Sequence, residues 1–341
     1  MNYKSSNYIP YGRHNITEDD ISKVVEVLRS PYITQGPKVT EFENAISKFI
    51  SCNYSVAVNS ATSALHLACL ALGLKKDDIL WTTPITFVAS ANCARYCNAL
   101  ADFVDIDLET GLISINALEK KLKESEKIGK LPKILVPVHL AGSSCNMRDI
   151  NALAKRYNFA VIEDASHAIG GEYLGHKVGS CMYSDITIFS FHPVKIITTG
   201  EGGIATTNNE KLAQIMRDLR THGIVKDQNR LINKNQGPWI YEQQNLGFNY
   251  RMNDMEAALG LNQLKRIKDI VSKRNQIYIR YSKLLYELPL KLLEVPKDVY
   301  SSLHLAVICL NEEYRKYHRV IFESLLKRNI GVQLHYTPVH L

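Results

Sequence analysis

Val161-Ile162-Glu163-Asp164-Ala165-Ser166-His167 is the stretch that decides the fold class, because it joins a short apolar run to two acids and a histidine. An apolar run of this length between polar residues predicts a buried strand with the acids at its carboxyl end. A carboxylate in such a place is costly to bury unless a cation pairs with it. A cap or turn residue is the alternative interpretation of one acid at a strand end.

Similar short apolar runs occur on both sides of this stretch, separated by segments long enough for a helix. This alternation predicts an α/β fold, a mostly parallel sheet with helices on both faces and ligands at the carboxyl ends of the strands. The predicted strands are 55–58, 79–81, 101–104, 134–138, 159–162, 186–189 and 203–207. The predicted helices of this part are 18–28, 39–49, 61–73 and 147–157.

The pattern changes after about residue 250. Residues 254–288 predict one long helix, followed by a strand at 303–310, a helix at 314–328 and a strand at 331–335. We therefore expect a large α/β domain over 1–250, with an N-terminal arm over 1–30, and a small C-terminal α+β domain over 251–341. Because the chain stops directly after a strand signal, we expect the small domain to be incomplete at its C-terminus.

The composition fits a globular protein of 341 residues, with 45% hydrophobic and 22% charged residues. No apolar stretch reaches the roughly 18–20 residues of a membrane span, and the start lacks the apolar region of a signal peptide. Seven cysteines, an odd number spread through apolar stretches, suit a reducing compartment. We expect a cytoplasmic protein that binds no membrane. The net charge of +7 is spread thinly, which argues against nucleic acid and suits an anionic small molecule.

A second motif, Asn59-Ser60-Ala61-Thr62-Ser63-Ala64-Leu65, turns from a predicted strand into an apolar helix through small hydroxyl residues. The free N–H groups of a helix N-terminus bind phosphate well, and the hydroxyls of Ser60, Thr62 and Ser63 add donors. Taken alone, however, this pattern favours an ordinary N-cap.

A third motif, Phe189–Gly203, places Lys195 among apolar residues just after a predicted strand. A partly buried lysine has a lowered pKa and a reactive amine; the alternative is a lysine whose amine reaches solvent. The letters of Gly200–Ala205 match a dinucleotide-binding fingerprint, but this segment predicts a strand where that fingerprint needs a helix, so we reject it.

Together the three motifs suit one cofactor, pyridoxal phosphate. It needs a cradle for its phosphate, an acid for its pyridine nitrogen and a lysine for its aldehyde, and the motifs supply all three at predicted strand ends. Phe87, within Thr83–Asn92, is available to cover the ring. No metal site is expected.

With these motifs the sequence resembles the sugar aminotransferases of the DegT/DnrJ/EryC1/StrS family, pyridoxal-phosphate enzymes of fold type I. The resemblance covers nearly the whole chain. It is carried by residues 34–37, 59–65, 83–92, 163–170, 190–203, 220–223, 246–253 and 335–340.

The resemblance implies a catalytic set of Lys195, which binds the cofactor and transfers protons, Asp164 at the pyridine nitrogen and His167 near the phenolic oxygen. It implies a homodimer in which Asn249 reaches the partner's cofactor phosphate. Implied cofactor contacts also include Ser60, Ala61, Thr62, Phe87 and Ser190. Segments that contact the nucleotide sugar contain Tyr11, Pro31, Tyr32, Ile33, Thr34, His335 and Tyr336. His192 and His222 stay open between a functional and a structural role.

Within the family, Ser60–Leu65, Thr82–Phe87 and Ser166–Ala168 resemble the branch that acts in pseudaminic acid biosynthesis and flagellin glycosylation. The resemblance implies amino transfer from L-glutamate to C4 of UDP-2-acetamido-2,6-dideoxy-β-L-arabino-hexos-4-ulose. The alternatives are a C4 aminotransferase for another UDP- or dTDP-4-keto sugar, such as the D-configured one of bacillosamine-type pathways, an inactive truncated relative, and a non-catalytic regulatory protein. The set Lys195, Asp164 and His167 argues against the last of these.

Overall fold

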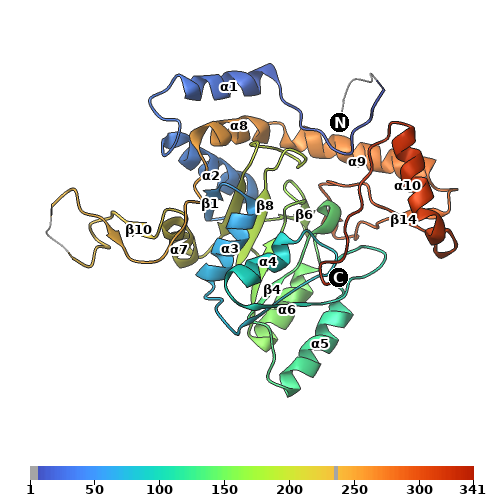
Figure 1. The fold of residues 1–341 in the computed structure, drawn as a ribbon, viewed down its shortest axis with the longest axis horizontal. Helices are drawn as coiled ribbons and strands as arrows, with labels where there is room; N and C mark the ends of the chain where they lie inside the picture. The colour runs from blue at the N-terminus through green and yellow to red at the C-terminus, as the bar shows by residue number, and fades with distance from the viewer. Residues whose placement is uncertain (1–6, 234–236) are drawn as a thin grey trace.

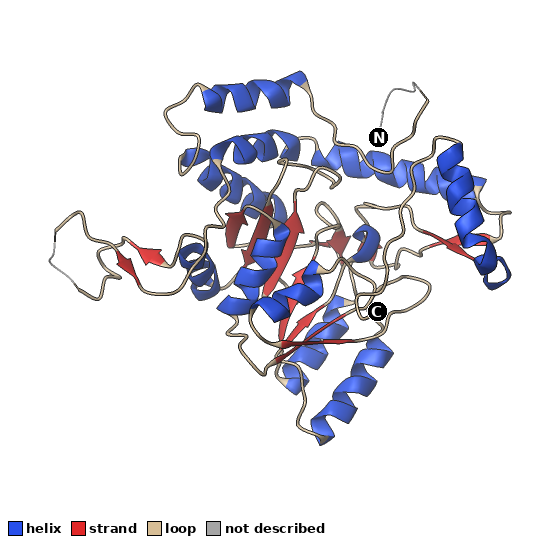
Figure 2. Ribbon diagram, viewed as in Figure 1, coloured by secondary structure: helices blue, strands red, loops and turns tan. Residues whose placement is uncertain are grey.

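The computed structural model describes residues 7–233 and 237–341 and centres on a seven-stranded sheet with the order β1-β9-β8-β5-β4-β2-β3 (Figures 1 and 2). Helices surround this sheet, as the alternating sequence pattern predicts. Its strands are β1 (Tyr54–Val58), β2 (Ile79–Thr82), β3 (Leu100–Phe103), β4 (Ile134–Val136), β5 (Ala160–Asp164), β8 (Ile186–Ser190) and β9 (Gly203–Thr207).

The sheet is mostly parallel, which confirms the predicted α/β fold class. Strands β3, β2, β4, β5 and β8 pair in parallel, whereas β9 runs antiparallel to both β8 and β1. Strand β9 runs antiparallel to β8 because the connection between them, residues 191–202, contains no crossover helix. The carboxyl ends of β1, β5 and β8 therefore meet the amino end of β9 at one edge of the sheet.

Alternating side chains of each strand pack against helices on opposite faces. In β4, Ile134 and Val136 face one apolar cluster and Leu135 faces another. The first face is covered by α3 (Ala61–Ala71), α4 (Ala89–Tyr96) and α7 (Glu210–Leu219). The second face is covered by α2 (Pro37–Ile50) and α8 (Asp254–Leu264) near β1, and by α5 (Ile115–Lys127) and α6 (Met147–Tyr157) toward β3.

The long helix predicted over 254–288 is wrong, because the chain breaks it into α8 and α9 (Ile267–Leu284). At the break, the N–H groups of Lys265 and Arg266 bond to carbonyls three residues back, which tightens the turn and ends α8. The guanidinium of Arg266 pairs there with buried Asp20 of α1 (Glu18–Leu28). A tertiary contact therefore sits at the point where the chain changes direction.

The strand predicted over 303–310 is also too long. Of this range only β14 (Ile308–Leu310) forms a strand, which pairs with β12 (Leu290–Leu292). Residues 301–305 instead run alongside the turn η1 (Leu140–Gly142), to whose carbonyls they donate backbone hydrogen bonds. The predicted helix 314–328 is a 3₁₀ segment, η2 (Glu312–Tyr317), that continues into α10 (His318–Lys327). The predicted strand 331–335 is wrong: no strand of the described residues covers it, and its neighbour Ile330 forms a single bridge with Ile9.

Besides the β12–β14 pair, two more small sheets of the described residues lie outside the central one. Strand β13 (Val299–Tyr300) pairs with β6 (Glu172–Tyr173), which pairs with β7 (His176–Lys177). Strands β10 (Ile224–Val225) and β11 (Glu242–Gln243) form a hairpin that projects away from the central sheet beside α7 (Figure 1). Because β13 joins a strand of the first part of the chain, the domain boundary at residue 250 stays a prediction. No helix in the described ranges is long and apolar enough to cross a membrane.

Candidate active site

Asp164 is the last residue of β5 and lies at the edge where β1, β5 and β8 end; it is 5% exposed. One carboxylate oxygen accepts from the hydroxyl of Ser90 at 2.6 Å, and the other accepts from the hydroxyl of Ser166 at 2.6 Å and from its N–H at 3.1 Å. These donors occupy both carboxylate oxygens and hold the side chain in one orientation. The sequence analysis gave neither serine a role, and no local signal links Ser90, on α4, to a strand 74 residues away.

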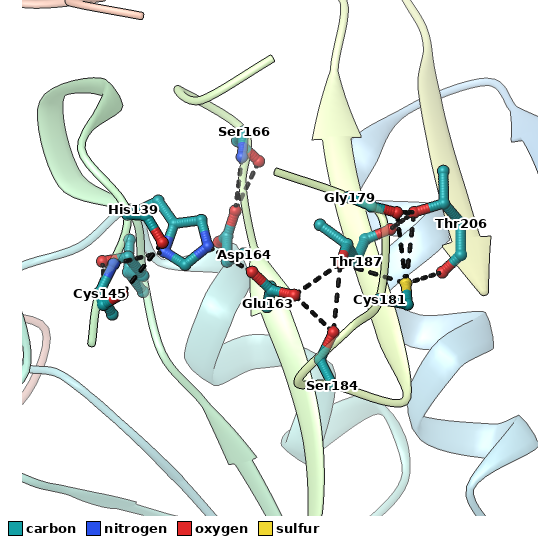
Figure 3. A network of polar contacts seen from close by, with 12 residues as sticks. His139, Cys145, Glu163, Asp164, Ser166, Gly179, Cys181, Ser184, Thr187 and Thr206 are labelled. Atoms are coloured by element: carbon teal, nitrogen blue, oxygen red, sulfur yellow. Dashed lines mark hydrogen bonds and ion pairs between the residues drawn. The ribbon is translucent and has the colours of Figure 1, made fainter. Parts of the chain in front are cut away.

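The preceding acid, Glu163, points to the opposite face of the sheet, because successive strand side chains alternate (Figure 3). Its carboxylate accepts from the Ser184 and Thr187 hydroxyls, at 2.5 and 2.9 Å, and contacts His139 Nε2 at 2.6 Å. The Cys145 N–H donates to His139 Nδ1, so the proton of that ring lies on Nε2, toward Glu163. Glu163 therefore has its partners on the face of the sheet opposite to the side chain of Asp164.

Lys195 lies in the loop that joins β8 to β9, where its backbone N–H donates to the His192 carbonyl. Burial lowers the pKa of Lys195 to about 8, although the charge of Asp164 acts in the opposite direction. The side chain borders a cavity of about 650 Å³ that Tyr11 and His304 also line. Most of the amine is still protonated at physiological pH, but its neutral fraction is far larger than that of a lysine with the ordinary pKa of about 10.4, as a nucleophilic amine requires.

The turn from β1 into α3 forms a cradle. Ser60 caps α3 by accepting from the Ser63 N–H at 3.1 Å, so its hydroxyl has the ordinary N-cap role. The N–H groups of Ala61 and Thr62, in the first turn of α3, have no acceptor within the part of the chain that is described. Gly203 lies against this turn, since a Cβ on it would come within 2.4 Å of the Ala61 nitrogen. Ser190 pairs with Gly203 across the β8–β9 ladder, which brings its side chain to the same place.

Aromatic and imidazole side chains form a group beside these residues. His167 Nε2 lies 3.4 Å from the Tyr336 hydroxyl, and the rings of Tyr336 and Phe87 are 6.4 Å apart. The Tyr11 hydroxyl hydrogen-bonds to His335 Nε2 at 2.8 Å, with the two rings stacked. Segments from the start, middle and end of the chain therefore meet here. Phe87 keeps 58% of its surface exposed, as a side chain that covers a bound ring requires.

Other predicted site residues lie apart from this group. Residues 31–34 are exposed in the loop between α1 and α2, where the Ile33 carbonyl accepts from Asp254. Asn249 is exposed in the segment after β11 and forms a backbone bridge with Thr221. His192 is exposed, and His222 is an exposed residue with φ of 60° whose backbone, not its ring, forms the contacts of the turn.

A lysine with a lowered pKa, a carboxylate held by three hydrogen bonds and helix N–H groups that have no acceptor in the described chain fit pyridoxal phosphate at this sheet edge. The lysine suits its aldehyde, the carboxylate its pyridine nitrogen and the N–H groups its phosphate. Fold and site define a pyridoxal-phosphate-dependent aminotransferase of fold type I. The chain belongs to the DegT/DnrJ/EryC1/StrS aminotransferase family, whose model matches residues 14–341. This confirms the expected family, enzyme class and cofactor: the protein is a sugar aminotransferase.

Three known proteins show the likeness in detail. The UDP-4-amino-4,6-dideoxy-N-acetyl-beta-L-altrosamine transaminase of Campylobacter jejuni (strain 81-176) is 43% identical over 337 residues, which are 97% of this chain and 84% of that protein. Helicobacter pylori PseC, an aminotransferase involved in pseudoaminic acid biosynthesis, superposes with a TM-score of 0.88 at 33% identity, over 98% of this chain and 86% of PseC. The PMP form of Spr1654 from Streptococcus pneumoniae gives 0.88 at 30% identity, over 97% and 86%.

Proposed function

We propose that this enzyme transfers the amino group of L-glutamate to C4 of UDP-2-acetamido-2,6-dideoxy-β-L-arabino-hexos-4-ulose. The product is UDP-4-amino-4,6-dideoxy-N-acetyl-β-L-altrosamine, a precursor in pseudaminic acid biosynthesis. The observation that carries the proposal is the placement of Lys195 and Asp164 at one sheet edge, close enough for the charge of Asp164 to raise the pKa of the lysine, in a chain 43% identical to the Campylobacter transaminase named for this product.

Pyridoxal phosphate supplies an aldehyde and an electron-withdrawing ring. In this proposal Lys195 would hold the aldehyde, and its amine, whose pKa burial lowers to about 8, would accept and return the proton that the exchange of the amino group requires. Asp164 keeps the pyridine nitrogen protonated, and its three hydrogen bonds hold it in place. His167 would donate a hydrogen bond to the phenolic oxygen of the cofactor ring. The remaining proposed cofactor contacts are Ser60, Ala61, Thr62, Phe87, Ser190 and Asn249 of the partner subunit.

The same proposal assigns the nucleotide sugar to the group around Tyr11, His335 and Tyr336, which adjoins His167. Residues 31–34 and Asn249 are exposed, and their described backbone contacts are with Asp254 and Thr221, not with this group, so we assign them to the site of the second subunit of a homodimer. Each active site would then contain residues from both chains.

The test is the visible absorption spectrum of the protein loaded with pyridoxal phosphate, before and after L-glutamate is added. We expect glutamate to convert the absorbance to that of the pyridoxamine form in the wild type but not in Lys195→Ala. Incubation with the L-configured 4-keto sugar should then give an amino sugar whose C4 configuration NMR identifies. No spectral change in a loaded wild type would contradict transamination, and turnover of the D-configured sugar alone would establish the alternative substrate.

A further inference from the structure

His304 lies in the segment 301–305, which leaves the small sheet and runs along η1. Its ring packs on the ring of His167, with 4.5 Å between the centroids and 43° between the planes. The two side chains are 7% and 6% exposed, and His304 borders the cavity that contains Lys195. A second imidazole is therefore buried against the one assigned to the cofactor.

The surrounding chain holds His304 in one place. Arg274, on α9, donates to the carbonyls of Leu303 and His304 at 3.1 and 3.0 Å. Leu303 has φ of 47°, a left-handed conformation that a branched side chain rarely adopts. The backbone comes so close to Gly142 that a Cβ there would lie 2.7 Å from the Leu303 nitrogen and 2.9 Å from the His304 nitrogen. Strain of this kind persists only where the surroundings fix it.

The rings of His167 and His304 also carry their proton on the same nitrogen. Nδ1 is buried without a hydrogen-bond partner in both His167 and His304, as far as the described chain provides partners. An orphaned N–H is rarer in proteins than an orphaned acceptor, so each neutral ring places its proton on Nε2. In His167 that N–H points toward the Tyr336 hydroxyl, at 3.4 Å.

The groups that face the pair keep it neutral. Burial, followed by the charge of Lys195, holds the pKa of both histidines well below the ordinary value. The neighbouring His335 acts in the same direction on both rings, and Arg274 does so on His304. Tyr336, the other titratable group at His167, is neutral as well, because burial raises its pKa.

We propose that His304 is a positioning residue, whose buried ring, tilted against that of His167, fixes the plane and the Nε2–H form of His167 and thereby the hydrogen bond that His167 offers to the ring oxygen of the cofactor. The inference rests on the proposed role of His167. Without the His304 ring, water would reach Nδ1 of His167, and the proton would move between the two nitrogens. His167 would then donate less well to the cofactor's ring oxygen.

The first test is a pH titration of the visible absorbance of the bound cofactor. A donor at the ring oxygen stabilises its anionic form, so His304→Ala should raise the midpoint by about one pH unit, the value of one hydrogen bond to a charged group. His304→Phe keeps a flat ring against His167 and should restore the wild-type midpoint. His176→Ala removes an exposed histidine and serves as the matched control, with no change expected.

A second readout needs no cofactor. In the apo protein labelled with ¹⁵N-histidine, the shifts of His167, assigned with His167→Asn, should show the Nε2–H form in the wild type and in His304→Phe, and a mixture in His304→Ala. An Nδ1–H form in the wild type overturns the inference even if His304→Ala does not fold.

The measurements distinguish a wrong role for His304 from a wrong role for His167. If His167→Asn shifts the cofactor midpoint and His304→Ala does not, His304 has no positioning role and the proposed role of His167 remains. If His167→Asn itself leaves the midpoint unchanged, the proposed role of His167 is wrong and the inference falls with it.

Discussion

At the scale of single residues, the amine of Lys195 and the missing Cβ of Gly203 are the features of the candidate site that the structure explains most directly. The amine of Lys195 has its pKa lowered to about 8 because the β8–β9 loop buries it. Gly203 lies where β9 begins, and the absence of a Cβ leaves room for the first turn of α3. One residue thus sets reactivity and the other sets the shape of the cradle.

The lowered pKa of Lys195 predicts how fast the apo enzyme takes up its cofactor. Only the neutral amine attacks an aldehyde, so the attachment rate should rise with pH up to about 8 and then level off. Stopped-flow absorbance measures this rate, and Lys195→Arg should show no attachment. A rate that keeps rising toward the ordinary lysine pKa of about 10.4 would contradict the buried setting.

Gly203→Ala should damage the cradle. The new Cβ would lie 2.4 Å from both Ala61 N and Ser60 C, which are backbone atoms and cannot move aside alone. Overpacking of this kind costs about 1–3 kcal/mol, so we expect a lower melting temperature and cofactor binding weakened by about tenfold or more. Fluorescence titration with pyridoxal phosphate checks the affinity. Gly12→Ala, whose Cβ would meet nothing nearer than 3.4 Å, is the matched control and should behave as wild type.

At the scale of elements, one buried carboxylate ties α1 to the junction of α8 and α9. Asp20 is fully buried and accepts from Asn262 and Gln263 at 2.8 Å and from Arg266 at 2.6 Å. It also closes a capping box with Thr17 at the start of α1. The same junction interrupts what the sequence pattern predicts to be one long helix.

Asp20→Asn should therefore lower the free energy of unfolding by about 3 kcal/mol, because it removes the negative charge from three buried or half-buried donors. Urea unfolding measures the loss. Asp19→Asn changes an exposed neighbour on the same helix and should change stability by less than about 0.5 kcal/mol. Equal losses in the two variants would show that the junction does not depend on Asp20.

The effect of Asp20 should depend on pH. Burial raises the pKa of Asp20, but hydrogen bonds from Thr17 and Asn262 and the charge of Arg266 outweigh it, so the pKa lies below its ordinary value. A carboxylate with a lowered folded-state pKa contributes fully above the unfolded value of about 3.9 and loses its contribution as the pH falls through the folded value. The difference between wild type and Asp20→Asn should accordingly be constant near neutrality and shrink below about pH 4. A difference that grows on acidification would contradict this sign.

At the scale of the whole molecule, exposed site residues point to a second subunit. Asn249 and residues 31–34 lie on the surface, and the projecting β10–β11 hairpin region carries exposed Trp239 and Leu246. Apolar side chains on a projecting hairpin suit burial against another copy of the chain. We expect a dimer by light scattering.

Hybrid dimers test whether the active sites are shared. Lys195→Ala and Asn249→Ala should each be inactive or strongly impaired alone. If Asn249 serves the partner's site, a hybrid has one intact site, and random mixing should restore about a quarter of wild-type activity. If both residues serve the same site within one chain, every site in the mixture carries a defect and no activity returns.

The sequence by itself determined the features that depend on local pattern. Short continuous apolar runs predict the strands of the central sheet, the segment pattern predicts α6 at its observed bounds, and the residues after the predicted strands include Asp164 and Lys195. Side chains at the carboxyl ends of parallel strands must share an edge, so the pattern also predicts where the site lies.

Only the tertiary structure decided how distant segments meet. The end of α8 at Leu264 coincides with a contact to Asp20, the path of 301–305 depends on Gly142, and Ser90 reaches Asp164 from another element. The packing of His304 on His167 belongs to the same class, since the two residues lie far apart in the chain. Such contacts leave no periodic trace in the sequence, because each depends on where two separately formed elements come to lie.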